Sequence, residues 1–236
     1  TYIIYMTDNG RPFPRCKTRL YDSGIRTPFL IARPGTIKPA VTDSLISSID
    51  ISATILELAG AKKDKRIQGV SFASVLEDPQ SKTRDFVFAE HNWHVYQAHE
   101  RMVRFGNFLY IRNNFPNQPN LSYESDDRTP AGAELWGAHA AGKTNPKQYQ
   151  IFANPCPAEE LFQVKEDPHQ LTNLADDSKH AKTLQRARAL LTKWANQTGD
   201  TVPVNPTPNR HDPPRIEDGK ILPPGKVKTR NPHAEM

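Results

Sequence analysis

The chain has 236 residues, of which 36% are hydrophobic, 24% charged and 8% aromatic, and its formal net charge is +5. No apolar run reaches the ~18 residues that a membrane span needs, and there is no triplet period, sustained heptad or cysteine framework, which excludes integral membrane, collagen-like, coiled-coil and disulfide-scaffold proteins. The mild positive charge is unaccompanied by zinc-finger spacing or a basic helix, so nucleic-acid binding is not indicated.

Residues 1–85 are predicted to form a section of an α/β domain. Tyr2–Met6 and Phe29–Ala32 are short apolar runs, typical of buried strands in a parallel sheet. The polar residues 7–10 end the first of these strands abruptly. Apolar residues at helical spacing from 42 or 43 to 59 predict a helix that covers the sheet.

Residues 86–200 are predicted to form a smaller subdomain. Its first strand is expected at 86–89 and leads into a polar, aromatic loop at 90–94. The β-rich runs 102–105 and 108–111 flank Gly106-Asn107, which is a strong hairpin signal. The order of these patterns predicts an antiparallel sheet.

The rest of the chain alternates between irregular and regular patterns. Residues 113–158 are rich in proline, glycine and amides, which predicts a long loop or lid. A strand is expected at 160–164 and an amphipathic helix at 177–196, because apolar residues recur there at helical spacing. Residues 201–236 contain eight of the 21 prolines and predict an extended tail, either disordered or lying along the surface.

The first strand ends in a carboxylate and an amide at adjacent positions, Asp8 and Asn9, followed by Gly10. In open α/β sheets, ligands collect at the carboxyl ends of strands. Hard cations such as Ca²⁺ take several oxygen ligands, and Gly10 is expected to let the backbone turn so that both side chains point to one centre. On these residues alone, the competing interpretation is an ordinary turn.

Four motifs occur in order along the chain. They are Asp8-Asn9-Gly10 with Pro12, Lys17 and Leu20–Leu30; Ser47–Leu56; Gln68–Phe72; and Glu160-Leu161-Phe162 with Asp167-Pro168 and Asn173-Leu174-Ala175. Together they resemble the sulfatase family over roughly residues 1–198, and within that family the sequence is most similar to heparan N-sulfatase-like (sulfamidase-like) members.

The resemblance implies a hydrolase of sulfate esters or sulfamates, in which a formylglycine attacks sulfur and one Ca²⁺ ion holds the sulfate. Carried over position by position, Asp8 and Asn9 match the family's Ca²⁺ ligands, and Asp8 is expected also to hold or deprotonate the formylglycine hydroxyl. Lys17 matches the basic residue that contacts the sulfate and the leaving oxygen. A fixed cation with preplaced donors suits charge that builds on a departing group.

The chain departs from the family at the nucleophile. Formylglycine forms in the pattern Cys/Ser-x-Pro-x-Arg, and neither Cys16 nor Cys156 has the required arginine. The family's N-terminal Asp-Asp pair is also missing. We therefore expect this chain to be the C-terminal part of a sulfatase, with the N-terminal part of the same enzyme as its partner. The two cysteines could pair or stay free, which leaves the redox compartment undetermined.

Three further residues are candidates for substrate binding. His91 and His94, in the predicted loop with Trp93 between them, could bind sugar hydroxyls or a leaving oxygen, although two surface histidines are the competing interpretation. Arg101 could reach a carboxylate or second sulfate of a glycan; otherwise it is a solvated side chain.

The expected fold is α/β and alkaline-phosphatase-like: a mixed sheet flanked by helices, plus a smaller antiparallel-sheet subdomain with one long helix. The expected substrate is a sulfated polysaccharide or glycosaminoglycan, and that substrate class favours a periplasmic or secreted location, although no signal peptide is visible. Two alternatives stay open. One is a phosphonate or phosphate monoester hydrolase of the same superfamily, and the other is a non-catalytic glycan-binding module.

Overall fold

The computed structural model describes residues 1–118, 120–125 and 128–222, which fall into two compact units. The first unit consists of Thr1–Met6, Pro28–Phe88 and Arg104–Gly106. The second consists of Thr7–Thr27, Ala89–Val103 and the chain from Asn107 onward. The segment that carries Asp8, Asn9 and Lys17 thus belongs to the second unit, whereas the sequence assigned it to the first section. No helix in the described ranges is long and apolar enough to cross a membrane.

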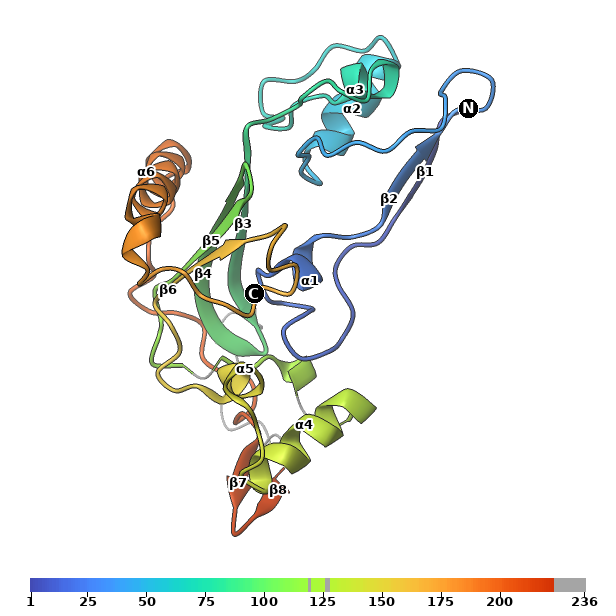
Figure 1. Ribbon diagram of the computed structural model, residues 1–236. Helices are drawn as coiled ribbons and strands as arrows, with labels where there is room; N and C mark the ends of the chain where they lie inside the picture. The colour runs from blue at the N-terminus through green and yellow to red at the C-terminus, as the bar shows by residue number, and fades with distance from the viewer. Residues whose placement is uncertain (119, 126–127, 223–236) are drawn as a thin grey trace. The chain divides into compact units, whose positions relative to one another are not determined.

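Strands β1 (Ile3–Met6) and β2 (Phe29–Ala32) form a two-stranded sheet in the first unit (Figure 1). Both strands were predicted, but the parallel arrangement is wrong, because Ile3 lies opposite Ala32 and Met6 opposite Phe29 in an antiparallel register. The expected burial is also wrong: Ile3 is 56% exposed and β1 is exposed along its length. An apolar run predicts a strand, but it predicts neither the direction of the paired strand nor whether other residues bury it.

Helix α2 (Asp50–Leu58) begins later than the helix predicted from residue 42 or 43, because Asp50 fixes its start. The buried Asp50 carboxylate accepts hydrogen bonds from Ser47 N at 2.8 Å, Val70 N at 2.7 Å and Arg84 Nε at 2.8 Å. Burial by itself would raise the pKa of Asp50, but these bonds hold it below its usual value. Helix α3 (Ala73–Glu77) follows.

The four-stranded sheet has the order β3-β4-β5-β6 (Figure 1), with β3 at Phe86–His94, β4 at Tyr96–Phe105, β5 at Phe108–Asn113 and β6 at Glu159–Gln163. The predicted hairpin at Gly106-Asn107 and the last strand are confirmed. The predicted loop at 90–94 is wrong, because β3 continues through it. Exposure alternates along this stretch, so its polar and aromatic residues occupy the two faces of a strand.

The predicted lid contains regular structure. Helix α4 (Pro130–Ala140) begins with proline at its first turn, and Thr129 Oγ1 accepts from Gly132 N at 3.0 Å. Helix α5 (Pro146–Tyr149) and the 3-10 helices η1 (Tyr123–Ser125) and η2 (Gln150–Phe152) also lie in this stretch. The capping residues Thr129 and Asn145, each followed by proline, were visible in the sequence. The loop prediction missed these helices because it used composition alone.

The predicted long helix is confirmed as α6 (Ala181–Thr198), which follows the 3-10 helix η3 (Ser178–His180). Leu184, Ala187 and Leu191 form its buried stripe, and Gly199 ends it in a left-handed conformation with φ of 71°.

The tail is more ordered than predicted over 201–222, where β7 (Arg215–Glu217) pairs with β8 (Lys220–Leu222). Its first part does lie along the end of β3, because Arg210 N donates to Val95 O at 2.7 Å and Trp93 Nε1 to Pro208 O at 3.0 Å. Residues 223–236 lie outside the described ranges.

One core of the second unit is built around the sheet and the segment 7–27. Leu20 and Tyr21 of that segment pack with side chains from three strands and the residue after β6. These are Met102, Leu109, Ile111, Phe162 and Val164. The short helix α1 (Asp22–Ile25) follows directly. This packing places the predicted site segment against the sheet.

Candidate functional site

The turn at Asp8-Asn9-Gly10 is held by two local side-chain–backbone hydrogen bonds and one backbone bond to Gly24. Asn9 N donates to Asp8 Oδ1 at 3.0 Å, Asn9 Nδ2 to Gly10 O at 2.7 Å, and Gly10 N to Gly24 O at 2.9 Å. A Cβ on Gly10 would overlap the Ser23 carbonyl oxygen, so glycine is required for this close approach. The expected reason was a special turn conformation, but the backbone of Gly10 is not left-handed.

Asp8 and Asn9 fit part of a calcium site. Asp8 is exposed, Asn9 is half-buried, and both offer the hard oxygen donors that Ca²⁺ prefers. Two side chains are too few, because Ca²⁺ takes about six to eight oxygen ligands. Within residues 1–118, 120–125 and 128–222, no group of three or more His, Cys, Asp or Glu side chains gathers in a metal-binding arrangement. The donor chemistry of these two side chains therefore fits the ion, and a complete Ca²⁺ site would need further oxygen ligands.

Lys17 lies in a tight loop closed by backbone hydrogen bonds. Lys17 N donates to Arg11 O at 3.0 Å, and Arg19 N donates to Cys16 O at 3.0 Å. Arg15 and Thr18 adopt left-handed conformations, with φ of 60° and 71°. Non-glycine residues hold such conformations only where the surroundings enforce them, and these positions cluster at functional sites.

Arg15 fastens one side of this loop. Its guanidinium donates to Gln150 Oε1 at 2.7 Å and to Gln170 O at 2.5 Å. It also lies 3.8 Å from the centre of the Tyr21 ring, in a cation–π contact. The loop is thereby attached to η2 and to the segment after β6.

Arg19 fastens the other side and lies in a buried polar cluster. It is 7% exposed, and its Nη2 contacts Glu100 Oε1 at 2.6 Å and Asn120 Oδ1. The second oxygen of Glu100 lies 2.9 Å from Nδ1 of His91. Burial by itself would raise the pKa of Glu100, but Arg19 and His91 hold it below its usual value. Glu100 thus joins the Lys17 loop to β3.

A second buried carboxylate lies beside this cluster. Tyr21 Oη donates to both oxygens of Glu160, at distances of 3.1 and 3.0 Å. Burial raises the pKa of Glu160 to about 7. The sequence prediction missed Arg19, Glu100 and Glu160 because buried charged side chains are not visible in a hydropathy pattern. The alternation Arg15-x-Lys17-x-Arg19 was the sequence pattern that could have indicated a role for Arg19.

His91 and His94 are not brought together, since residues three apart on a strand point to opposite faces. The His91 side chain is 11% exposed, and its Nε2 is buried and has no hydrogen-bond partner in the described part of the chain. In the same part, Nδ1 of His94 is also buried without a hydrogen-bond partner. Both remain predictions as substrate-binding residues.

Arg101 is neither solvated nor open to a ligand. It is 2% exposed and binds both oxygens of Asp200, with Nε–Oδ2 at 2.8 Å and Nη2–Oδ1 at 2.6 Å. Its Nη1 donates to the carbonyl of Glu100 at 2.8 Å. The fork geometry of the guanidinium suits this bidentate pair, so the structure gives Arg101 a structural role.

Both cysteines are free thiols. Cys156 is buried, its Sγ lies near the carbonyls of Pro116 and Gln118, and burial raises its pKa to about 11. A thiol of this kind is not a nucleophile at neutral pH. The chain therefore shows no candidate nucleophile of its own at Cys156.

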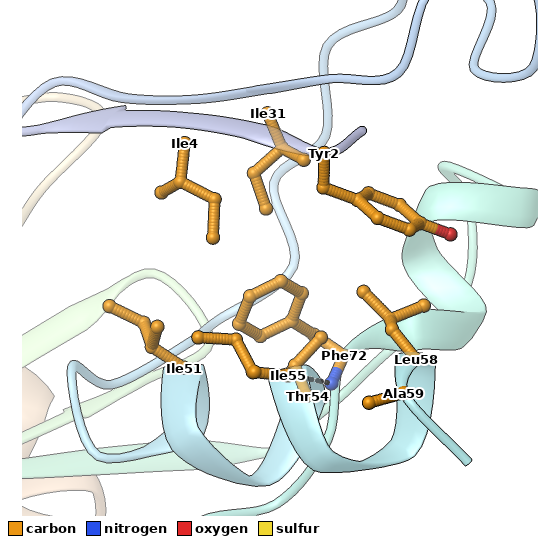
Figure 2. Close-up of a pocket in the computed structure, with 9 residues that line it drawn as sticks. All are labelled: Tyr2, Ile4, Ile31, Ile51, Thr54, Ile55, Leu58, Ala59 and Phe72. Carbon is orange, nitrogen blue, oxygen red and sulfur yellow. Dashed lines mark hydrogen bonds between the residues drawn. The ribbon is translucent and has the colours of Figure 1, made fainter.

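The first unit holds none of these residues but has an apolar cavity of about 390 Å³ (Figure 2). Its lining comes from β1 and the residue before it, β2, α2 and the residue after it, and the residue before α3. The lining residues are Tyr2, Ile4, Ile31, Ile51, Thr54, Ile55, Leu58, Ala59 and Phe72. Three other apolar side chains of the sheet, those of Ile3, Tyr5 and Leu30, are largely exposed.

Residues 16–109 match the family model for N-sulphoglucosamine sulphohydrolase, C-terminal. An ulvan-active sulfatase of Formosa agariphila is 36% identical over 203 residues, which cover 85% of this chain and 34% of that protein. N-sulphoglucosamine sulphohydrolase of Homo sapiens is 26% identical over 216 residues, covering 85% of this chain and 42% of that protein.

A solved structure described as a 2-O GAG sulfatase superposes with a TM-score of 0.58 at 24% identity, covering 84% of this chain and 37% of that one. This likeness shows the fold and confirms the alkaline-phosphatase-like expectation. The chain spans between a third and about two fifths of the length of the proteins that it matches.

Proposed function

Because the chain belongs to the sulfatase family and corresponds to the C-terminal part of its members, we propose that it supplies part of the active site of a hydrolase of sulfate esters or sulfamates. The observation that carries this proposal is the segment 7–27, in which Asp8, Asn9 and Lys17 follow one another on a backbone fastened to the second unit. Both arginines that flank Lys17 contribute to this attachment.

Each residue of the segment has a chemical role in the proposal. Asp8 and Asn9 would hold a Ca²⁺ ion, which when bound supplies positive charge to the sulfate oxygens. Lys17 places an ammonium near the transferring sulfo group and the leaving oxygen, where negative charge develops. The nucleophile, a formylglycine, lies outside this chain in the proposal, because neither cysteine has the required pattern.

The proposed partner of the chain is the N-terminal part of the same enzyme. Strands β1 and β2 are apolar on both faces, a pattern typical of strands that are covered on both sides. One face lines the cavity of Figure 2, and exposed Ile3, Tyr5 and Leu30 leave a second apolar surface. Further strands and helices of that part would bury both surfaces.

The proposed substrate is a sulfated polysaccharide or glycosaminoglycan, with His91 and His94 as sugar-binding residues. Support comes from relatives described as an ulvan-active sulfatase and N-sulphoglucosamine sulphohydrolase, which share most of this chain. Substrates of this class occur outside the cytoplasm, so we propose a periplasmic or extracellular location.

The test uses the full-length protein and a panel of ulvan oligosaccharides, heparan disaccharides, 4-nitrophenyl sulfate and a phenylphosphonate monoester. We expect sulfate release, and we expect Asp8→Ala and Lys17→Ala to lower kcat about 100-fold or more. Asp8→Ala should also lower bound calcium. Asp64→Ala, at an exposed turn beside Arg66, is the matched control and should leave both readings unchanged.

Three results would contradict the proposal. Wild-type turnover and calcium content in Asp8→Ala would remove the metal assignment. Preferential hydrolysis of the phosphonate ester would replace sulfatase by phosphonate chemistry. Saccharide binding without any turnover would identify a glycan-binding module.

A further inference from the structure

His91 carries an unusual pair of ring nitrogens. Its Nδ1 lies 2.9 Å from Glu100 Oε2, whereas its Nε2 is buried and has no hydrogen-bond partner within the described ranges. A buried polar atom without a partner is unfavourable, so Nε2 needs a hydrogen-bond partner that the described residues do not supply. In His91, the other ring nitrogen is already fixed by Glu100.

The bond to Glu100 decides what Nε2 can do. A carboxylate only accepts hydrogen bonds, so Nδ1 must carry a proton. In the neutral imidazole, Nε2 then has a lone pair and acts as an acceptor. An acceptor at this position suits a hydroxyl group and disfavours a sulfate, which offers only acceptor oxygens.

Glu100 is itself fixed by a second partner. Arg19 contacts Oε1 at 2.6 Å, and the side chains of Arg19 and Glu100 are 8% and 4% exposed. Arg19 therefore balances the charge of Glu100.

We propose that Glu100 is a positioning residue that holds His91 with Nε2 as the hydrogen-bond acceptor for a ring hydroxyl of the sulfated sugar. This inference rests on the proposed function and adds a specificity rule to it. His91 recognises a hydroxyl donor on the sugar, and Glu100 sets that preference without touching the substrate.

The variant Glu100→Gln tests this rule in the full-length protein. The glutamine oxygen remains as the acceptor that Arg19 requires, which turns the amide nitrogen toward His91 Nδ1. The imidazole must then accept at Nδ1 and carry its proton on Nε2, so the acceptor becomes a donor. We expect selective ¹⁵N-histidine spectra to show this exchange of the protonated nitrogen.

The kinetic readout is KM for the sulfated disaccharide that the full-length protein hydrolyses best, with 4-nitrophenyl sulfate as a substrate without sugar hydroxyls. We expect Glu100→Gln and His91→Ala each to raise KM for the disaccharide at least about tenfold more than KM for the aryl ester. The aryl ester reports any disturbance of the Arg19 attachment, which affects both substrates. The double variant should be no worse than His91→Ala, because Glu100 acts through His91.

The control variant is Glu159→Gln. It removes the charge of a β6 carboxylate that pairs with Arg188, and it should change neither the tautomer of His91 nor KM. The proposal is overturned if Glu100→Gln adds its full loss on top of His91→Ala, impairs both substrates equally, or leaves the tautomer unchanged. An active Asp8→Ala protein would instead overturn the proposed function. The two failures are therefore distinguishable.

Discussion

The Arg19–Glu100 ion pair should be important for the stability of the second unit. Both side chains are almost fully buried, and Nη2 and Oε1 are 2.6 Å apart. Arg19→Met would leave the Glu100 carboxylate in the interior without its cation. Removing one partner of a buried pair costs about 3–5 kcal/mol, because the remaining charge keeps its desolvation penalty. We expect a loss of this size in the free energy of unfolding, measured by urea titration of the full-length protein.

Two further variants separate this effect from a general loss of charge. In Arg19→Met/Glu100→Leu both charges are gone, so most of the loss should be recovered. Arg188→Met breaks a pair with Glu159 whose side chains are 52% and 28% exposed, and it should cost no more than about 1 kcal/mol. A loss below about 1 kcal/mol for Arg19→Met would refute the reasoning. So would a loss in the double variant equal to the sum of the losses in Arg19→Met and Glu100→Leu.

Three other predictions concern pH, backbone contact and thiol chemistry. The pKa of Glu160 is about 7, above its usual 4.5, so its contribution to stability is complete below pH 4.5 and is lost as the pH rises through 7. Glu160→Gln should reduce the difference between the free energies of unfolding at pH 5 and pH 8, measured by urea titration. An unchanged difference would contradict this prediction. Gly10→Ala should lower the free energy of unfolding by more than about 1 kcal/mol, since its Cβ would overlap Ser23 O, and an unchanged urea midpoint would count against that contact. Ellman's reagent at pH 8 should modify Cys16 faster than Cys156, as judged by peptide mass spectrometry, and equal rates would disprove the burial argument.

Elements with a strong local signal were predictable from the sequence. The stripe of α6 and the Gly106-Asn107 hairpin depend on residues close together in the chain, and the structure confirms both. The start of α2 was not predictable in this way. It depends on Asp50, whose carboxylate reaches Val70 and Arg84, far along the sequence.

The sequence predicted the residue types of the site, but it did not predict the contacts that hold the segment in place. Asp8, Asn9 and Lys17 came from a motif, and the structure places them on one segment. The assignment of that segment to the first section differed from the structure, because its attachments are long-range. Arg19 meets Glu100 across 81 positions, and no pattern within residues 7–27 indicates that partner.

The alternation of two arginines with one lysine explains why this loop can serve a charged site. A guanidinium is a planar group that can satisfy several acceptors at once. Arg15 donates to one side-chain and one backbone oxygen of the second unit, and Nη2 of Arg19 donates to two side-chain oxygens. An ammonium is a compact point charge on a flexible stem, suited to meeting an oxyanion. Arg15 and Arg19 therefore fix the backbone on either side of Lys17, while the left-handed conformations at Arg15 and Thr18 turn the chain between the two attachments. Exchanging the residue types at these positions would remove the attachments and misplace the charge, even though the net charge of the loop would stay the same.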